Sequence, residues 1–329
     1  MVRAAPIATL NATAAASAGW PEAGGGHRFV AYFIWLVVYG ALAGAIYALV
    51  ALTFVIVYKA SRTMNFATGE WVMFGALLTS SGLHGFNLAG AGLAGLLGAI
   101  LIAALAMAAF ATALSRVVLR HMTGRSLMAM IMLTLGLGTL MRGFGPIIFK
   151  GRANAIVSPI ESDYIEILGL VLPPERLLSA VVATLCIAAV GCFYQYTRTG
   201  LALRAIAADP AAASGAGVDV TGHITLSWAL AGIVAVVAGV LWSIVSGGGI
   251  GTALVGMKVF PIVVIGGLNS IPGCILGAMV IGVADSLASG YLDRLVGSGV
   301  SIVVSSLLLL AALWLRPWGL FGERVATRV

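Results

Sequence analysis

Charged residues are scarce in this sequence of 329 residues: Asp, Glu, Lys and Arg make up 9% of it, against about 25% in an ordinary soluble domain. This scarcity excludes a soluble globular protein. The 61% of hydrophobic residues and the mean hydropathy of +1.09 indicate an integral membrane protein instead. Apolar runs of about 20 residues, long enough to cross a bilayer as a helix, recur along nearly the whole chain. The sequence therefore predicts an all-α, polytopic bundle of membrane helices rather than a barrel of strands.

Motifs that would support enzymatic chemistry are missing as well. The four histidines and three cysteines are scattered without the spacing of a metal site, and no serine lies in a G-x-S-x-G motif. The G-x-x-x-x-G-K motif that binds the phosphates of ATP is also absent. The net charge of +7 is expected of cytoplasmic loops in a membrane protein, so it does not indicate nucleic-acid binding. We therefore expect a non-enzymatic membrane protein that itself binds no metal, cofactor or nucleic acid.

The apolar runs divide the chain into about eight predicted membrane helices. Residues 1–28 contain no run of spanning length and are predicted to be a loosely ordered N-terminal tail. Residues 29–318 are predicted to form the transmembrane domain, and residues 319–329 a short basic C-terminal tail. A short hairpin is expected near residues 164–168, in a loop outside the membrane. The predicted helices cover about residues 29–58, 65–82, 88–118, 127–149, 175–196, 224–245, 258–287 and 299–315.

Small residues gather on one face of the first predicted helix. Transmembrane interfaces use such residues because they let two backbones approach closely. We therefore expect this face to pack tightly on another helix. The residues are Gly40, Ala41, Ala43, Gly44, Ala45 and Ala48.

The segment at residues 258–287 is apolar but is interrupted near its middle. The interruption contains Gly266, Gly267, Asn269, Pro272 and Gly273. Non-helical backbone at membrane depth is tolerated only where it is buried in protein or lines a cavity. The sequence therefore predicts a broken helix or a re-entrant hairpin here.

Polar residues begin the second apolar segment, directly after the basic pair Lys59 and Arg62. They are Asn65, Thr68 and Glu70. Because a carboxylate is costly to place in hydrocarbon, Glu70 indicates a polar pathway through the membrane. A position at the headgroup level, or a buried structural role, would also accommodate Glu70.

Two further ionisable residues lie in apolar sequence. Arg142 either lines or gates a path, or snorkels to the membrane surface from near a helix end. Asp285 is either a second intramembrane carboxylate or a helix-end group close to Asp293 and Arg294. The sequence leaves both alternatives open.

The distribution of basic residues predicts which loops are cytoplasmic. Basic residues gather at residues 59–62, 116–125 and 198–204, and acidic residues gather in the intervening loop at residues 161–175. The basic loops are therefore placed in the cytoplasm. Eight spans would put both termini outside, whereas the basic C-terminal tail favours a cytoplasmic C-terminus. A re-entrant hairpin around residues 266–273 would reconcile the two.

The segment at residues 198–222 has the pattern of a short capped helix. Asp209 is a good N-cap and Pro210 suits the first helical turn, so a helix is predicted from Pro210 to Gly215 or Gly217. A helix this short and rich in small residues needs another protein to pack against.

Several motifs resemble the LivH-type permeases of branched-chain amino acid ABC importers. The resemblance covers roughly residues 30–318, and several ordered blocks are more specific than one short motif. The blocks are GALAGAIYALVALTFVIVYKASRTMNFATGEWVMFGALL, TLGLGTLMRG, TRTGLALRAIAADPAAASGAGVDV and IGGLNSIPGCILGAMVIGVAD, in that order.

The resemblance implies the permease subunit of an ATP-driven importer in the bacterial inner membrane. Such a subunit works with a LivM-like second permease, two ATP-binding subunits that use the ATP, and a periplasmic substrate-binding protein. The resemblance also implies roles for particular residues. Asn65, Thr68, Glu70 and Asn269 would line the path or brace its helices; Arg204, Asp209, Pro210 and Gly217 would couple to the ATPase; Gly266, Gly267, Pro272 and Gly273 would form the broken-helix backbone.

Other functions stay open on the sequence. Thr68 stands where the family usually has His, so the resemblance does not fix the substrate. Permeases of the same family for urea and amides, sugars or aromatic acids are alternatives. A different class would be a stand-alone secondary transporter that uses Glu70 and Asp285 as ion-coupling carboxylates.

Overall fold

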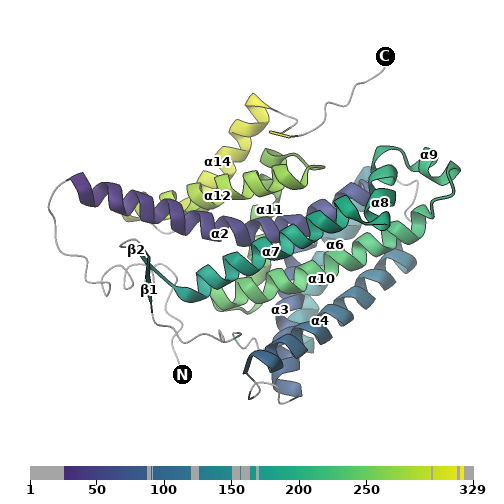
Figure 1. Ribbon diagram of the computed structural model, residues 1–329, viewed down its shortest axis with the longest axis horizontal. Coiled ribbons are helices and arrows are strands. Elements are labelled where there is room, and N and C mark those ends of the chain that lie inside the picture. The colour runs from purple at the N-terminus through teal and green to yellow at the C-terminus, as the bar shows by residue number, and fades with distance from the viewer. Residues whose placement is uncertain are drawn as a thin grey trace.

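The structure is a computed structural model that describes residues 26–86, 90, 92–119, 126–149, 156, 164–167, 170–297, 299–316 and 319–321. The predicted N-terminal tail lies outside the described residues up to residue 25, and the predicted C-terminal tail does so from residue 322. The residues described between the two tails are almost entirely helical, which confirms the predicted fold class (Figure 1).

The described elements begin and end close to the predicted segments. The hairpin expected near residues 164–168 is confirmed, because β1 and β2 pair in antiparallel fashion. The elements are α2 (Gly26–Ser61), α3 (Thr68–Gly85), α4 (Gly92–Leu114), η2 (Ser115–Leu119), α6 (Leu127–Ile148), β1 (Ile165–Ile167), β2 (Leu170–Leu172), α7 (Pro174–Tyr196), α8 (Arg198–Ala208), α9 (Pro210–Gly215), α10 (Val220–Ser246), η3 (Ile250–Val255), α11 (Gly256–Gly266), α12 (Ile271–Tyr291), α13 (Asp293–Val296) and α14 (Val300–Leu315).

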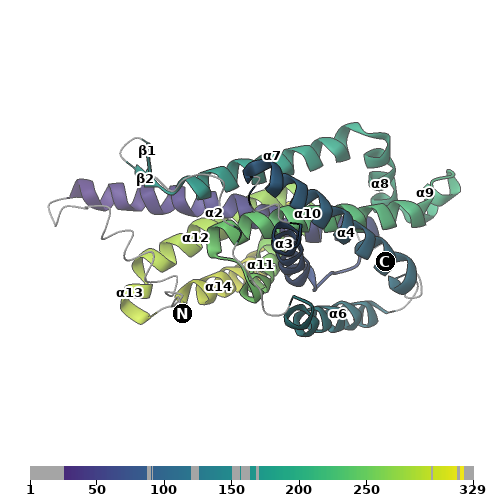
Figure 2. The same cartoon turned by 90° about the horizontal axis from the view of Figure 1, so that it is seen from below.

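Six described helices are long and apolar enough to cross a membrane: α2, α4 with η2, α6, α7, α10 and α12. Two shorter apolar helices, Gly251–Gly266 and Val300–Leu315, add to them, so the predicted count of about eight is approximate. The helix α3 is as long as a minimal span but less apolar, and it lies at the centre of the bundle. Figure 2 shows α3 nearly end-on, surrounded by α4, α6, α10 and α11.

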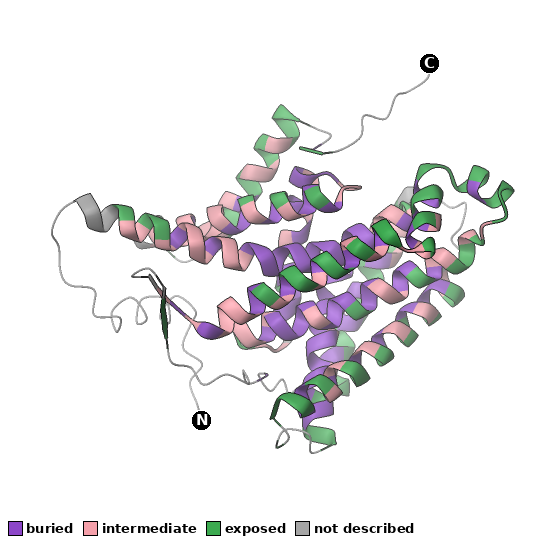
Figure 3. Ribbon diagram, viewed as in Figure 1, coloured by how far each residue is buried: buried purple, intermediate pink, exposed green. Residues whose placement is uncertain are grey.

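The core follows the second half of α2, where residues 45–57 are buried on all sides (Figure 3). This half packs against α7, α10 and α12. The outer helices α4, α6 and α14 instead carry many exposed leucine, isoleucine and methionine side chains. A helix that is apolar on all sides suits the centre of a membrane bundle, and apolar outer faces suit contact with lipid.

Glycines allow the central helices to touch backbone to backbone. A Cβ atom added to Gly40 of α2 would lie 2.7 Å from the carbonyl oxygen of Gly282 in α12. A Cβ atom on Gly282 would in turn lie 2.7 Å from the Cα of Gly44. The predicted close-packing face of the first helix is therefore confirmed, with α12 as its partner. The helices α3 and α10 cross in the same way, because a Cβ atom on Gly75 would lie 2.6 Å from the Cα of Val236.

The interrupted segment at residues 258–287 forms a helical hairpin. Gly266 at the end of α11 contacts Gly273 near the start of α12, and Gly277 of α12 lies against the backbone of Ile262. Because the last residues of α11 contact the first residues of α12, the two helices run antiparallel. The turn between them contains Gly267 at a φ of 107°, a conformation that favours glycine. The predicted break is therefore confirmed, in the form of a hairpin.

The hairpin brings the end of α14 to the end of the bundle that holds Lys59, Arg62 and Arg204, which we call the basic end. After α14, the amide of Leu320 donates to the carbonyl of Ile265, 2.8 Å away, at the end of α11. Residues 319–321, predicted to belong to the C-terminal tail, are thus bonded to the helical domain. This arrangement agrees with a cytoplasmic C-terminus if the basic end is cytoplasmic, as the charge distribution predicts.

The glycine contacts between α2 and α12 predict a large effect of added side-chain volume. We expect Gly282→Val to destabilise the protein by about 1–3 kcal/mol, because the added methyl groups would meet backbone atoms that cannot move aside. Thermal unfolding of the detergent-solubilised protein measures the effect as a fall in Tm. Gly191→Val in α7 is the matched control, since a Cβ atom at Gly191 has nothing within 4 Å. Equal Tm values for the two variants would contradict the close contact.

Candidate functional site

The chain between α2 and α3 runs through the protein interior without forming a helix. Thr63, Asn65 and Ala67 in this stretch are all buried, with exposed fractions of 3% or less. Buried backbone outside a helix must find hydrogen-bond partners other than those of a helix.

Side chains supply these partners. The Asn65 side-chain oxygen accepts a hydrogen bond from the amide of Ala67 at 3.1 Å, and the Thr68 hydroxyl donates to the Asn65 carbonyl at 2.7 Å. The hydroxyl of Thr134, on α6, donates to the carbonyl of Met64 at 3.2 Å. These hydrogen bonds tie Asn65 and Thr68 to the backbone at the start of α3, and their bracing role stays a prediction.

The helix α3 begins halfway along its neighbour α6. A Cβ atom on Gly138, which lies near the middle of the 22 residues of α6, would be 3.5 Å from the Cα of Ala67. Closer to the start of α6, Met130 contacts Thr63. The extended stretch thus accompanies the first half of α6, and α3 starts beside the middle of that helix.

A second helix begins at the same place. A Cβ atom on Gly256, the first residue of α11, would lie 2.6 Å from the Cα of Gly69. The rings of Phe66 and Phe260 stack beside this contact, with centroids 5.7 Å apart. The α-helical parts of α3 and α11 therefore start against each other, with α11 continuing directly from η3. Discontinuous helices that begin at mid-depth are a feature of solute sites in transporters.

Glu70, in the first turn of α3, forms an ion pair with Arg142 of α6. The Glu70 side chain is 7% exposed and the Arg142 side chain 54%. Gly138 leaves room for the carboxylate, since a Cβ atom there would lie 3.2 Å from Glu70 Oε2. Glu70 is thus a group that is buried in the protein and paired with a cation.

Lys258, in the first turn of α11, forms a second, partly buried ion pair. Its ammonium contacts the carboxylate of Asp285 on α12 and donates to the Tyr47 hydroxyl of α2 at 3.0 Å. Tyr47 donates in turn to Asp285 Oδ2 at 2.9 Å. The reading of Asp285 as a helix-end group beside Asp293 and Arg294 is therefore wrong, and its partner comes from a different helix.

The helices α8 and α9 project at the basic end, as Figure 1 shows. The Asp209 carboxylate accepts hydrogen bonds from the amides of Ala211 and Ala212, at 2.8 and 3.1 Å, so it caps α9 as predicted. Pro210 occupies the first helical position. The chain leaves α9 through Gly217 at a φ of 84°, and the amide of Val218 donates back to the carbonyl of Ala213.

The helix α8 is attached firmly to the spans. The Arg62 guanidinium, just after α2, donates to the Ala207 carbonyl at 2.8 Å. Leu203 and Ile206 of α8 are buried, each with 1% exposure. A Cβ atom on Gly200 would lie 2.5 Å from the carbonyl oxygen of Tyr194 in α7. By contrast, most of α9 is exposed (Figure 3).

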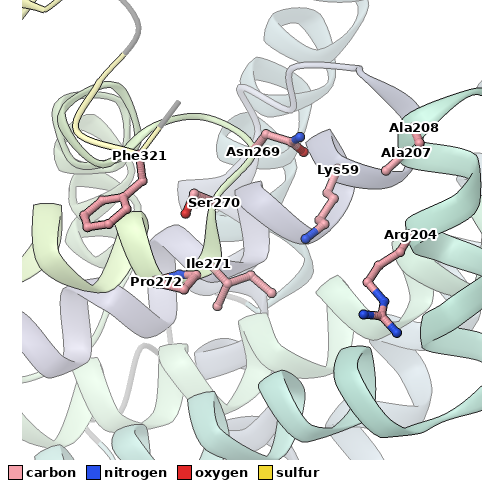
Figure 4. A pocket seen from close by; sticks show the side chains of 9 residues that line it. All are labelled: Lys59, Arg204, Ala207, Ala208, Asn269, Ser270, Ile271, Pro272 and Phe321. Carbon is pink, nitrogen blue, oxygen red and sulfur yellow. The ribbon is translucent and has the colours of Figure 1, made fainter. Parts of the chain in front are cut away.

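Asn269 lies apart from Asn65, Thr68 and Glu70. It belongs to the turn between α11 and α12, which Gly266, Gly267, Pro272 and Gly273 also form. There it lines a cavity of about 290 Å³ at the basic end. Figure 4 shows Asn269 there with Lys59 from the end of α2 and Arg204 from α8. The structure therefore does not group Asn269 with the other residues predicted for the path.

Sequence reasoning missed the partners of both intramembrane carboxylates. Arg142 is 72 residues from Glu70, and Lys258 is 27 residues from Asp285. The available signal was the number of intramembrane charges, since each carboxylate in apolar sequence requires a compensating cation. In the described part of the chain, no group of three or more His, Cys, Asp and Glu residues could hold a metal ion.

Known proteins resemble this chain over most of its length. It is 29% identical over 307 residues to the high-affinity branched-chain amino acid transport system permease protein LivH of Salmonella typhimurium, covering 91% of this chain and 98% of that protein. It is 26% identical to the corresponding permease protein BraD of Pseudomonas aeruginosa, with the same coverage. The solved structure of PsaBC from Streptococcus pneumoniae in complex with Fab has a TM-score of 0.44 and 16% identity, covering 86% of this chain and 95% of that chain.

A family profile matches most of the chain. The profile described as branched-chain amino acid transport system / permease component matches residues 36–313. These residues include the starts of α3 and α11 and the capped α9. This protein therefore belongs to the family of permease components of branched-chain amino acid transport systems.

Proposed function

We propose that this protein is the permease subunit of an ATP-driven importer of branched-chain amino acids, in which it forms half of the translocation path. Membership of the permease family over residues 36–313 is the observation that carries the proposal. The relatives LivH and BraD are named as high-affinity branched-chain amino acid permeases, which supports this class of substrate. The apolar helices and the family make the chain a multi-pass protein of the bacterial inner membrane.

An importer permease of this family works with an ATPase and further transporter components. In finer detail we propose a LivM-like second permease, two ATP-binding subunits that use the ATP, and a periplasmic substrate-binding protein. The exposed α9 supports the contact with an ATP-binding subunit, because a six-residue helix of small residues has little surface with which to pack on its own chain. Coupling would then involve Arg204, Asp209, Pro210 and Gly217.

The mechanism that we propose is rigid-body movement. ATP binding moves the ATP-binding subunits, and the capped α9 transmits this movement to α8. The helix α8 passes it to α2 through the Arg62 hydrogen bond, and to α7 through the close approach at Gly200. Packed helices move as units, so the spans would tilt and alternate the access of the path between the two sides.

Uptake measurements decide between this function and its alternatives. Vesicles that hold the complete transporter should accumulate leucine only when ATP and the binding protein are present. Accumulation of urea, sugars or aromatic acids in place of leucine would indicate a permease of the same family with another substrate. Uptake by this chain alone, driven by an ion gradient, would instead indicate a secondary transporter.

We expect Asp209→Ala to uncouple the transporter. The substitution removes a cap worth about 1 kcal/mol, which loosens α9 without disturbing the core of the bundle. The expected result is a normal yield of assembled complex with lower ATP hydrolysis in response to the loaded binding protein. Asp209→Asn, which keeps a cap acceptor, is the matched control. Normal stimulated ATP hydrolysis by Asp209→Ala would contradict the coupling role of α9.

The two substitutions Glu70→Gln and Glu70→Leu separate bracing from ion coupling. Gln keeps an oxygen that can accept from Arg142, so we expect assembly and leucine uptake close to wild type. Leu provides no acceptor for Arg142 beside the buried start of α3, which removes the contact that joins α3 to α6, so we expect failed assembly. Uptake in vesicles and size-exclusion chromatography measure the two effects. Loss of uptake by a well-assembled Glu70→Gln variant would favour a carboxylate that titrates during transport.

A further inference from the structure

Arg142 is a charged side chain in a membrane helix whose exposed part needs a polar environment. Its side chain is 54% exposed, although α6 is one of the six helices long and apolar enough to span a membrane. Snorkelling to the surface does not explain this, because the pairing with Glu70 holds the guanidinium beside the buried start of α3. A guanidinium that faced lipid there would be strongly unfavourable. The exposed side of Arg142 therefore faces either water or another protein.

The exposed residues of α6 form a wide arc that runs from beside the contact with α3 to the opposite side of the helix. Leu135 lies seven residues before Arg142, so the two residues share one side of the helix. Leu140 lies two residues before Arg142 and so points in nearly the opposite direction. Both leucines are exposed, at 44% and 58%. We call the side of Leu135, Thr139 and Arg142 the Arg142 face; the Leu140 side is suited to lipid.

The ion pair orients the guanidinium without using all of its donors. Arginine has five N–H donors, and one terminal nitrogen is bonded to Glu70 Oε1. Glu70 is buried and Gly138 gives its carboxylate room, so this side of the guanidinium is fixed. Because 54% of the Arg142 side chain is exposed, donors remain available to a further acceptor. The start of α3, with its partial positive charge, lies in the same region and adds to its attraction for an anion.

We propose that Arg142 faces the water-filled translocation path and donates hydrogen bonds to the carboxylate of the solute as it passes. This inference rests on the proposed function, because an amino acid is a solute that carries a carboxylate. A guanidinium and a carboxylate match in geometry, and the contact would form at mid-depth, where the two short helices begin. Glu70 is then a positioning residue, which acts on the solute through Arg142.

Cysteine labelling of the assembled transporter tests which face meets water. The variants are Leu135→Cys and Leu140→Cys, made with the three native cysteines replaced by alanine; both leave the ion pair intact. A charged, water-soluble thiol reagent should label Leu135→Cys and leave Leu140→Cys unlabelled. A shielded Leu135→Cys would overturn the proposal, because the Arg142 face would then be covered by another protein. The native cysteines are Cys186, Cys192 and Cys274.

A double substitution tests the contact with the carboxylate. Arg142→Gln alone would leave Glu70 without its partner, so it is combined with Glu70→Gln, which removes both charges. We expect the double variant to assemble and to hydrolyse ATP, but to take up leucine roughly tenfold to a hundredfold more slowly than Glu70→Gln alone, because a charged hydrogen-bond donor is lost. Equal uptake by the two variants would show that Arg142 serves only to neutralise Glu70, and would overturn the proposal.

The wild-type transporter separates failure of this inference from failure of the proposed function. If it takes up no leucine with ATP and binding protein, the proposed function fails and the carboxylate contact fails with it. If it takes up leucine and the double variant matches Glu70→Gln, the proposed function stands and only the role of Arg142 is overturned.

Discussion

Two helices begin against each other inside this protein, and the structure depends on how closely they approach. The approach requires glycine on both sides, because a Cβ atom on Gly69 or on Gly256 would meet the backbone of the other helix. The start of α3 also leaves amide groups without partners within the helix and carries partial positive charge, whereas α11 continues directly from η3. Such a start is unfavourable in hydrocarbon. The surrounding helices therefore have to enclose it, and this requirement explains why α3 lies at the centre of the bundle.

At both helix starts, a charged residue in the first turn forms an ion pair with a neighbouring helix. Glu70 is the third residue of α3 and pairs with α6; Lys258 is the third residue of α11 and pairs with α12. A buried ion pair adds little net stability over apolar packing, but removing one partner is costly because the other is left uncompensated. The two pairs therefore mainly determine which neighbouring helix each short helix packs against. They add little to the stability of the fold. Tyr47 extends this specification to α2 by bonding to both members of the second pair.

The features that the sequence predicts correctly are local ones. The Asp209 cap, the break after Gly266 and the close-packing face around Gly40 each depend on residues within one or two helical turns, so their patterns can be read directly. The ion pairs depend on tertiary packing, which brings together residues from different helices. The sequence pattern does not mark Lys258 as an intramembrane charge, because it lies at the edge of an apolar segment. The resemblance groups Asn269 with Asn65, whereas the hairpin of α11 and α12 places it at the basic end.

The same contacts suggest how a movement at the basic end could reach the two helix starts. The helix α8 is bonded to the end of α2, and α2 packs on α12 through contacts at Gly40, Gly44 and Gly282 that leave no space for sliding. Because α12 carries Asp285, a displacement of α2 and α12 together would carry Lys258 and the start of α11 with it. The helix α6 has few contacts with the rest of the chain beyond α3 and η3, so it would not be drawn along by this unit. The contact between Gly69 and Gly256 is therefore the place where such a movement would change the geometry, and Arg142 lies beside it on the helix that stays behind.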